Sequence, residues 1–449
     1  MLYNFNSIPQ SIMVNPAAEI EAQAYFGIPL VSGIYANVGA SNVSVYDLFA
    51  DNNLDFNTKV ENVIYTLSSN DVQRVSEQIE VVNVGFKVDG RFSDTFISFG
   101  AYQELDFFNY WPRDLSILAY EGNSPNIGVP FRLDQLSIKG ELLTVFHLGF
   151  QKKVNDKFTY GARGKIYSSL IDFTSTKNSG IFTTTLGQDN FYRHTLLSDV
   201  EVKTSGYASL REDDVNGARD VYDILKGRAI FGGNLGLGLD LGITYSPNEN
   251  WMYTASLVDL GMIFHTKDVE RYTLKGSYAL EGIELPFDDI FNTGGIADNW
   301  QELVDEIEAA FPRDTITDAY TTMRPLKFNA AGIYKFGNPR RSRDCSCTSS
   351  RDGLQNSIGM QLYLENRPKS IETALTAFYS RSFGNALDVK ATYTIDKFSK
   401  TNIGLGLSTH FANFNFNLLA DNLIEYYNLA KANNASVQVG LNYVFPVRD

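Results

Sequence analysis

Cysteine is nearly absent from this chain of 449 residues, which contains only Cys345 and Cys347 in a polar Asp-Cys-Ser-Cys-Thr stretch. Two thiols exclude a disulfide-rich scaffold and a four-cysteine zinc site. A disulfide between them would close a small, strained ring. We therefore place this stretch in a loop and expect no metal site in the protein.

Long apolar runs and catalytic motifs are missing as well. No run approaches the roughly 18 apolar residues of a membrane helix, which excludes a helical membrane protein. Histidines number only four, and the G-x-S-x-G, H-E-x-x-H and P-loop motifs do not occur. We expect a protein that is not an enzyme and has no cofactor. A membrane hydrolase whose nucleophile and base come from separate strands is the alternative that the sequence leaves open.

Charge is scarce too, because only 20% of the residues are charged, and acidic residues outnumber basic ones by 52 to 38. The resulting net charge of -14 makes nucleic acid an unsuitable partner. The N-terminus, Met-Leu-Tyr-Asn-Phe-Asn, has no signal-peptide pattern. Either the chain is cytosolic or a signal peptide has been cleaved.

What the sequence has in abundance is aromatic residues, 31 Phe and 25 Tyr, and a period of two. In residues 231–246, apolar side chains such as Leu239 and Leu241 alternate with small or polar ones such as Gly238 and Asp240. The same alternation recurs in residues 136–151, 158–170, 387–395, 403–408, 414–418 and 437–445. Such stretches exceed the mean strand of soluble proteins, which has about 5–6 residues.

Two folds explain long strands with one apolar face. A soluble antiparallel sandwich buries that face, whereas a transmembrane barrel turns it toward lipid and its polar face toward a lumen. Strand length, aromatic content and hairpin order favour the barrel. We predict an all-β fold, a transmembrane antiparallel up-and-down β-barrel of about 14 strands, within a range of roughly 12–16, with long loops. One or two of the candidate strands would then belong to loop hairpins.

Charged and polar side chains on the inner faces of these strands are the candidate functional residues. We predict that the lumen is lined by Lys139, Glu141, His147, Arg163, Lys165 and Asp240. One interpretation is an internally compensated charge network, and the other is contact with a substrate.

Two segments outside the predicted strands stand out. Residues 1–22, which contain Asn15, Pro16 and Ala17, form either a disordered terminus or a hatch-like plug inside the barrel domain of residues 23–449. Residues 298–311 form an amphipathic helix with a capping box at its start. Its apolar stripe includes Trp300, Leu303, Ile307 and Phe311. The helix either packs over the barrel mouth or docks a protein partner.

Several segments resemble a known family: the Asn-Pro-Ala triplet and residues 236–245, 255–263, 403–407 and 420–424. They resemble an uncharacterised outer-membrane β-barrel family of Bacteroidota over nearly the whole chain. More distantly, the triplet ahead of a many-stranded barrel is similar to the FadL-like long-chain fatty-acid transporters. In that class the N-terminus forms a hatch inside a 14-stranded barrel, and one member is an accessory barrel of type IX secretion.

The resemblance implies a bacterial outer-membrane protein whose signal peptide has been cleaved. The barrel would contact outer-membrane lipid, and its loops would lie in the periplasm and the extracellular space. Two functions follow. The first is a non-enzymatic accessory subunit of a secretion, assembly or motility complex, with protein partners and a filled barrel. The alternative is a FadL-like transporter that passes a hydrophobic or small amphipathic solute through a hatch-gated lumen.

Overall fold

The computed structural model describes residues 1–88, 94–188, 191–211, 217–281, 317–339, 354–384 and 386–445. The strands are β1 (Ala24–Gly27), β2 (Ile34–Ala40), β3 (Val72–Val88), β4 (Thr95–Tyr110), β5 (Pro130–Arg132), β6 (Ile138–Asn155), β7 (Phe158–Leu186), β8 (Tyr192–Ser205), β9 (Asn234–Tyr245), β10 (Trp251–His265), β11 (Val269–Glu281), β12 (Tyr320–Met323), β13 (Lys327–Pro339), β14 (Leu354–Asn366), β15 (Ile371–Phe383), β16 (Leu387–Ile395), β17 (Asn402–Phe411), β18 (Phe414–Asp421) and β19 (Asn434–Phe445). The predicted helix at 298–311 and the two cysteines lie outside the described residues.

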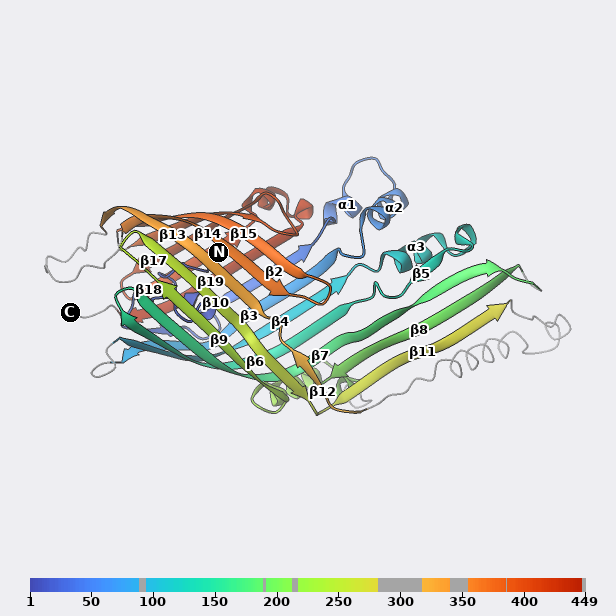
Figure 1. Ribbon diagram of the computed structural model, residues 1–449, viewed down its shortest axis with the longest axis horizontal. Coiled ribbons are helices and arrows are strands. Elements are labelled where there is room, and N and C mark those ends of the chain that lie inside the picture. Colours follow the sequence, from blue (N-terminus) through green and yellow to red (C-terminus); the bar gives the residue numbers. More distant parts are fainter. Residues whose placement is uncertain are drawn as a thin grey trace.

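Fourteen wall positions close into one antiparallel ring. β1 and β2 both pair with β19 and β3, so together they occupy one position. β12 and β13 likewise share the position beside β10. The ring then runs β1/β2, β3, β4, β6, β7, β9, β10, β12/β13, β14, β15, β16, β17, β18 and β19. The predicted 14-stranded barrel is confirmed (Figure 1).

The alternation of the sequence becomes the two faces of the wall. On β9, Leu237, Leu239 and Leu241 are exposed on the outside, while Asp240 between them is buried in the lumen. At one end of β10 the rings of Trp251 and Tyr253 stack with centroids 6.0 Å apart. Exposed aliphatic side chains bordered by aromatic rings are typical of a wall that faces lipid.

A sheet of four strands extends beyond the ring, formed by β5, the outer part of β7, β8 and β11. β7 pairs with β9 as far as Ser169, and from Asp172 onward it pairs with β8 instead. β8 in turn pairs with β11, so that this sheet projects from one end of the barrel (Figure 1). β8 forms a hairpin with the outer part of β7, and β8 and β11 therefore lie outside the ring.

Helices occupy the connections and the N-terminal segment: η1 (Pro9–Met13), α1 (Val45–Phe49), α2 (Phe56–Thr66), α3 (Arg113–Glu121), η2 (Ser124–Asn126), η3 (Ala208–Leu210), α4 (Ala218–Ala229) and η4 (Leu423–Lys431). α1, α2 and α3 lie toward the same end as the projecting sheet (Figure 1). In the described ranges, no helix combines the length and the apolar character needed to cross a membrane.

Candidate lumen site

Residues 1–22 lie inside the ring of strands, where the wall binds their backbone. Lys390 on β16 donates hydrogen bonds to the carbonyl oxygens of Met1, at 2.9 Å, and of Tyr3, at 2.5 Å. Arg163 on β7 donates to the carbonyl oxygens of Ile12, at 3.0 Å, and of Met13, at 2.6 Å. Two cations on separate strands therefore hold the start and the middle of this segment.

Neutral wall groups add further contacts to the same segment. The Ser256 hydroxyl on β10 donates to the carbonyl oxygen of Val14 at 2.7 Å. Gln10 donates through its amide to Asn442 on β19, at 2.8 Å, and to Glu80 on β3, at 2.9 Å. Contacts from β3, β7, β10, β16 and β19 place the segment across the lumen rather than along one wall.

The Asn15-Pro16-Ala17 triplet packs against glycines of the wall. A Cβ atom added at Gly161 would lie 2.1 Å from the Pro16 carbonyl oxygen, and one added at Gly242 would lie 2.2 Å from Asn15 Oδ1. Because side chains cannot approach so closely, only glycine permits this contact at these two positions. The triplet also folds on itself, since the Ala17 N–H donates to Asn15 Oδ1 at 3.0 Å.

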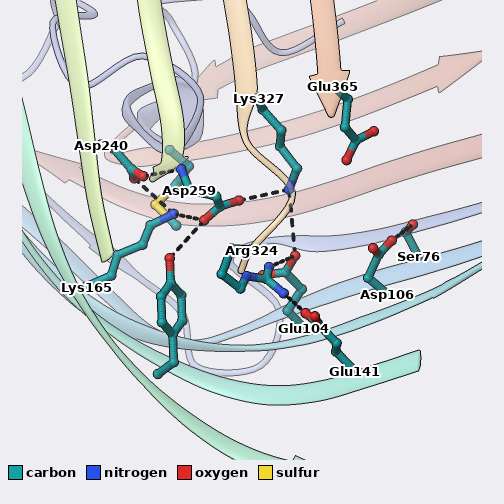
Figure 2. Close-up of polar contacts among 12 residues, drawn as sticks. Ser76, Glu104, Asp106, Glu141, Lys165, Asp240, Asp259, Arg324, Lys327 and Glu365 are labelled. Carbon is teal, nitrogen blue, oxygen red and sulfur yellow. Dashed lines mark hydrogen bonds and ion pairs between the residues drawn. The ribbon is translucent and has the colours of Figure 1, made fainter. Parts of the chain in front are cut away.

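A chain of alternating charges crosses the lumen beside the segment (Figure 2). It starts with Arg163 and Asp240, which lie opposite each other on β7 and β9. Lys165 Nζ lies 3.0 Å from Asp240 and 2.6 Å from Asp259, and Lys327 Nζ lies 2.9 Å from Asp259. Each charge has an opposite neighbour, as burial in a site of low dielectric requires.

Asp259 reaches this chain because of a β-bulge. The pairing of β10 with β9 shifts register between Leu257 and Leu260, and Asp259 takes a positive φ of 63°. Val258 and Asp259 consequently both face inward, which breaks the period of two. The Asp259 N–H also donates to Asp240 Oδ1 at 2.7 Å.

Two acids that face each other on the wall draw cations from the far side of the lumen. Asp106 and Glu141 are register partners on β4 and β6, an arrangement that is destabilising unless it is compensated. Arg367, which follows β14, lies 2.6 Å from Asp106, and Arg324, which precedes β13, pairs with Glu141. Figure 2 shows the Arg324 contact with Glu141.

Further pairs complete a cross-lumen bridge, which we define as Glu104, Asp106, Glu141, Arg324, Lys327 and Arg367. Arg324 also lies 2.8 Å from Glu104 on β4, and Lys327 lies 3.8 Å from it. In the ring, β6, β7, β9 and β10 separate β4 from β13. The bridge therefore joins wall positions that are far apart in the ring. Removing one partner of such a buried pair costs roughly 3–5 kcal/mol.

The six predicted lumen residues all lie on the inner face of the wall. They do not form a single network in the structure but divide into separate groups. Arg163, Lys165 and Asp240 form one cluster, and Lys139 pairs with Glu141. His147 stands apart: its ring centroid is 6.0 Å from that of Tyr102, and no ion pair joins it to any other residue of the described chain.

Sequence reasoning missed other charged residues of the lumen, including Glu104, Asp259, Arg324 and Lys327. The sequence offers one signal for Glu104 and Asp106, since they are the only charged residues in the aromatic-rich stretch of residues 96–110. In the described ranges, no group of three or more His, Cys, Asp and Glu side chains is placed to hold a metal ion.

A cavity of about 380 Å³ remains between the N-terminal segment and the wall. The segment contributes Met1, Tyr3 and Val14 to its lining, and the bridge contributes Glu104 and Lys327. The volume falls in the range of roughly 300–1,000 Å³ that ligand pockets occupy. The lumen is thus obstructed but not filled.

Comparison with known proteins adds the family. A model described as a family of unknown function (DUF5723) matches residues 16–421. The chain belongs to this family. The expectation of an uncharacterised barrel family is confirmed, whereas the origin in Bacteroidota and the link to type IX secretion stay predictions. No curated protein matches the DUF5723 chain in sequence.

Solved structures with a similar barrel share little sequence with the DUF5723 chain. A Pseudomonas aeruginosa FadL homologue has a TM-score of 0.45 at 10% identity, covering 99% of this chain and 96% of its own. The Ralstonia pickettii toluene transporter TbuX has a TM-score of 0.42 at 10% identity, with coverages of 98% and 94%. The P. putida toluene transporter TodX has a TM-score of 0.41 at 10% identity, with coverages of 100% and 94%.

Proposed function

We propose that this protein is a transporter of the bacterial outer membrane, through whose lumen a small amphipathic solute passes when residues 1–22 move. The observation that carries the proposal is the cavity of about 380 Å³ beside this segment. An even-stranded, single-chain barrel with an apolar outer face is typical of the bacterial outer membrane.

The contacts of the segment are of the kind that a movable plug needs. Lys390 and Arg163 bind main-chain carbonyl oxygens of the segment and not its charged side chains. At the Arg163 contact the charges of the wall are already compensated, because Asp240 pairs with Arg163 and lies 3.0 Å from Lys165. Withdrawal of the segment would thus leave Asp240 with a partner.

The accessory-subunit hypothesis requires a filled barrel, and the cavity favours transport over it. The lining of the cavity also indicates which class of solute fits it. Charged side chains such as Arg74, Glu104 and Lys327 line the cavity, so a purely hydrophobic solute is a poorer fit than an amphipathic one.

Deletion of residues 2–20 tests the role of the segment in planar bilayers. We expect a larger single-channel conductance, because the segment crosses the lumen. Heat-modifiable gel migration serves as the check that the deleted form is folded. A folded deletion variant whose conductance and solute uptake both equal those of the intact protein would refute the proposal.

A tethered variant covers the case in which the deletion variant does not fold. The Thr244 hydroxyl donates to the Ala17 carbonyl oxygen at 2.9 Å, so a cysteine at each position would link the segment to β9. Cys345 and Cys347 are replaced by Ser in this background. Oxidation should lower solute uptake and reduction should restore it, whereas equal uptake in both states contradicts a moving segment.

Docking of protein partners is a second proposal, supported by the sheet of β7, β8 and β11 that projects beyond the ring. Pull-down of the native protein from detergent tests it. A barrel that emerges without partners from membranes that contain its native neighbours would argue against a complex.

A further inference from the structure

The cavity beside the N-terminal segment has charged groups on its wall, and several of these groups already neutralise one another. Arg74 lies 2.9 Å from Glu365. Lys165 and Lys327 lie 2.6 Å and 2.9 Å from Asp259. A charged solute would have to compete with these pairs. Another cation of the lining, Lys397, lies over the Tyr110 ring.

Other carboxylates of the cavity are held by neutral donors. Glu80 accepts hydrogen bonds from Gln10 Nε2 and Ser32 Oγ, at 2.9 and 2.8 Å. Asp421 accepts one from Ser436 Oγ at 2.9 Å. Hydrogen bonds of this kind stabilise a carboxylate without a counter-ion, so these acids do not call for a cationic ligand.

Neutral amides and hydroxyls on the same wall are also available to a ligand. Gln361 Nε2 donates to Asn329 Oδ1 at 2.9 Å, and both side chains are more than nine-tenths buried. An amide has two donor hydrogens and an acceptor oxygen. Gln361 Oε1 and Asn329 Nδ2 therefore remain, and no hydrogen bond joins them to other residues among those described.

Phenol rings from two separate wall positions, β14 and β2, add to the lining. Tyr35 and Tyr363 both line the cavity, and their hydroxyls make no hydrogen bond to any residue of the described ranges. A tyrosine offers an apolar ring face and a polar tip in one rigid group. Fixed amides beside such rings match a molecule whose rim carries hydroxyls and whose ring faces are apolar.

We propose that this cavity binds a small neutral polyhydroxylated solute, a sugar of mono- or disaccharide size. Each sugar hydroxyl both donates and accepts, so it can satisfy Gln361 Oε1 and Asn329 Nδ2 together. A hydrocarbon would leave both amides unpaired in a buried site, and an ion would disrupt the compensated pairs. The inference rests on the proposed transport function and names its solute class.

Equilibrium dialysis of the full-length protein in detergent tests the inference with maltose, glucose, arginine and 1-octanol as probes. We expect binding of maltose or glucose, and at least tenfold weaker binding by the Gln361→Leu variant. The Gln103→Leu variant, which makes the same change on the exposed outer face of β4, should bind as the unchanged protein does.

If the Gln361→Leu variant does not fold, the Tyr363→Phe variant replaces it in the test, because it removes only a hydroxyl. Tyr363→Phe should weaken sugar binding several-fold. Binding of arginine or 1-octanol without either sugar overturns the inference, as does an equal loss in the Gln361 and Gln103 variants. If deletion of residues 2–20 raises conductance while no sugar binds, transport stands and only the solute class is wrong.

Discussion

Arg163 holds the N-terminal segment from β7, and its replacement by leucine tests that contact directly. The guanidinium donates to the carbonyl oxygens of Ile12 and Met13 and pairs with Asp240. Arg163→Leu keeps an apolar stem in the lumen but removes every donor. We expect residues near Met13 to leave the wall far more often in this variant.

The size of the effect follows from the lost hydrogen bonds. A hydrogen bond to a charged group contributes about 1.5–3 kcal/mol, so two of them contribute roughly 3 kcal/mol at the lower end. At about 1.4 kcal/mol per factor of ten, opening of the segment should increase roughly 100-fold. The barrel itself should lose less than the roughly 3–5 kcal/mol of an orphaned buried charge, because Lys165 stays 3.0 Å from Asp240.

Maleimide labelling of a cysteine at Ser11 measures this opening. Ser11 is fully buried, so its labelling rate follows the population of the open state when closing is fast. Cys345 and Cys347 are replaced by Ser in all variants. The Lys177→Leu control lies on β7 beyond the ring, where Lys177 is half exposed. An unchanged rate in Arg163→Leu, or an equal increase in Lys177→Leu, would refute the reasoning.

Two further predictions concern the wall. The Gly242→Ala variant places a Cβ atom 2.2 Å from Asn15 Oδ1 and should displace the Asn15-Pro16-Ala17 triplet. The protease sensitivity of the N-terminal segment should therefore rise. The control is Gly164→Ala, whose Cβ atom meets no atom within 4 Å and should leave the protease sensitivity unchanged. The Leu237→Arg variant puts a charge on the lipid face and should lower the free energy of unfolding in lipid vesicles by about 2–4 kcal/mol if the position lies at mid-bilayer. Leu237→Phe is its control, and equal urea midpoints for the two variants would contradict a lipid-facing β9.

Most of the wall could be predicted from the sequence, because a period of two determines both the strand and its lipid-facing side. The prediction weakens where the period breaks. The period does not predict that Asp259 faces the lumen, because the bulge between Leu257 and Leu260 turns two consecutive side chains inward. The length of β7 was missed in the same way, because nothing local marks Ser169 as the point where its partner changes from β9 to β8.

The lumen could be predicted only in part. Arg163, Lys165 and Asp240 lie on neighbouring strands, so the alternation alone places them together. Arg324 and Glu141 are 183 residues apart in the chain and meet across the ring. Which inner charges meet in this way depends on the cross-section of the closed barrel, which no local pattern in the sequence encodes.

The contact between Gln10 and Asn442 bears on the order of folding. These two residues are 432 positions apart, and Asn442 belongs to β19, the strand that closes the ring against β1 and β2. The N-terminal segment meets its full set of partners only after β16 and β19 are in place. The segment therefore takes its place after the strands that follow it in the chain, and occupation of the lumen reports that the barrel has been completed.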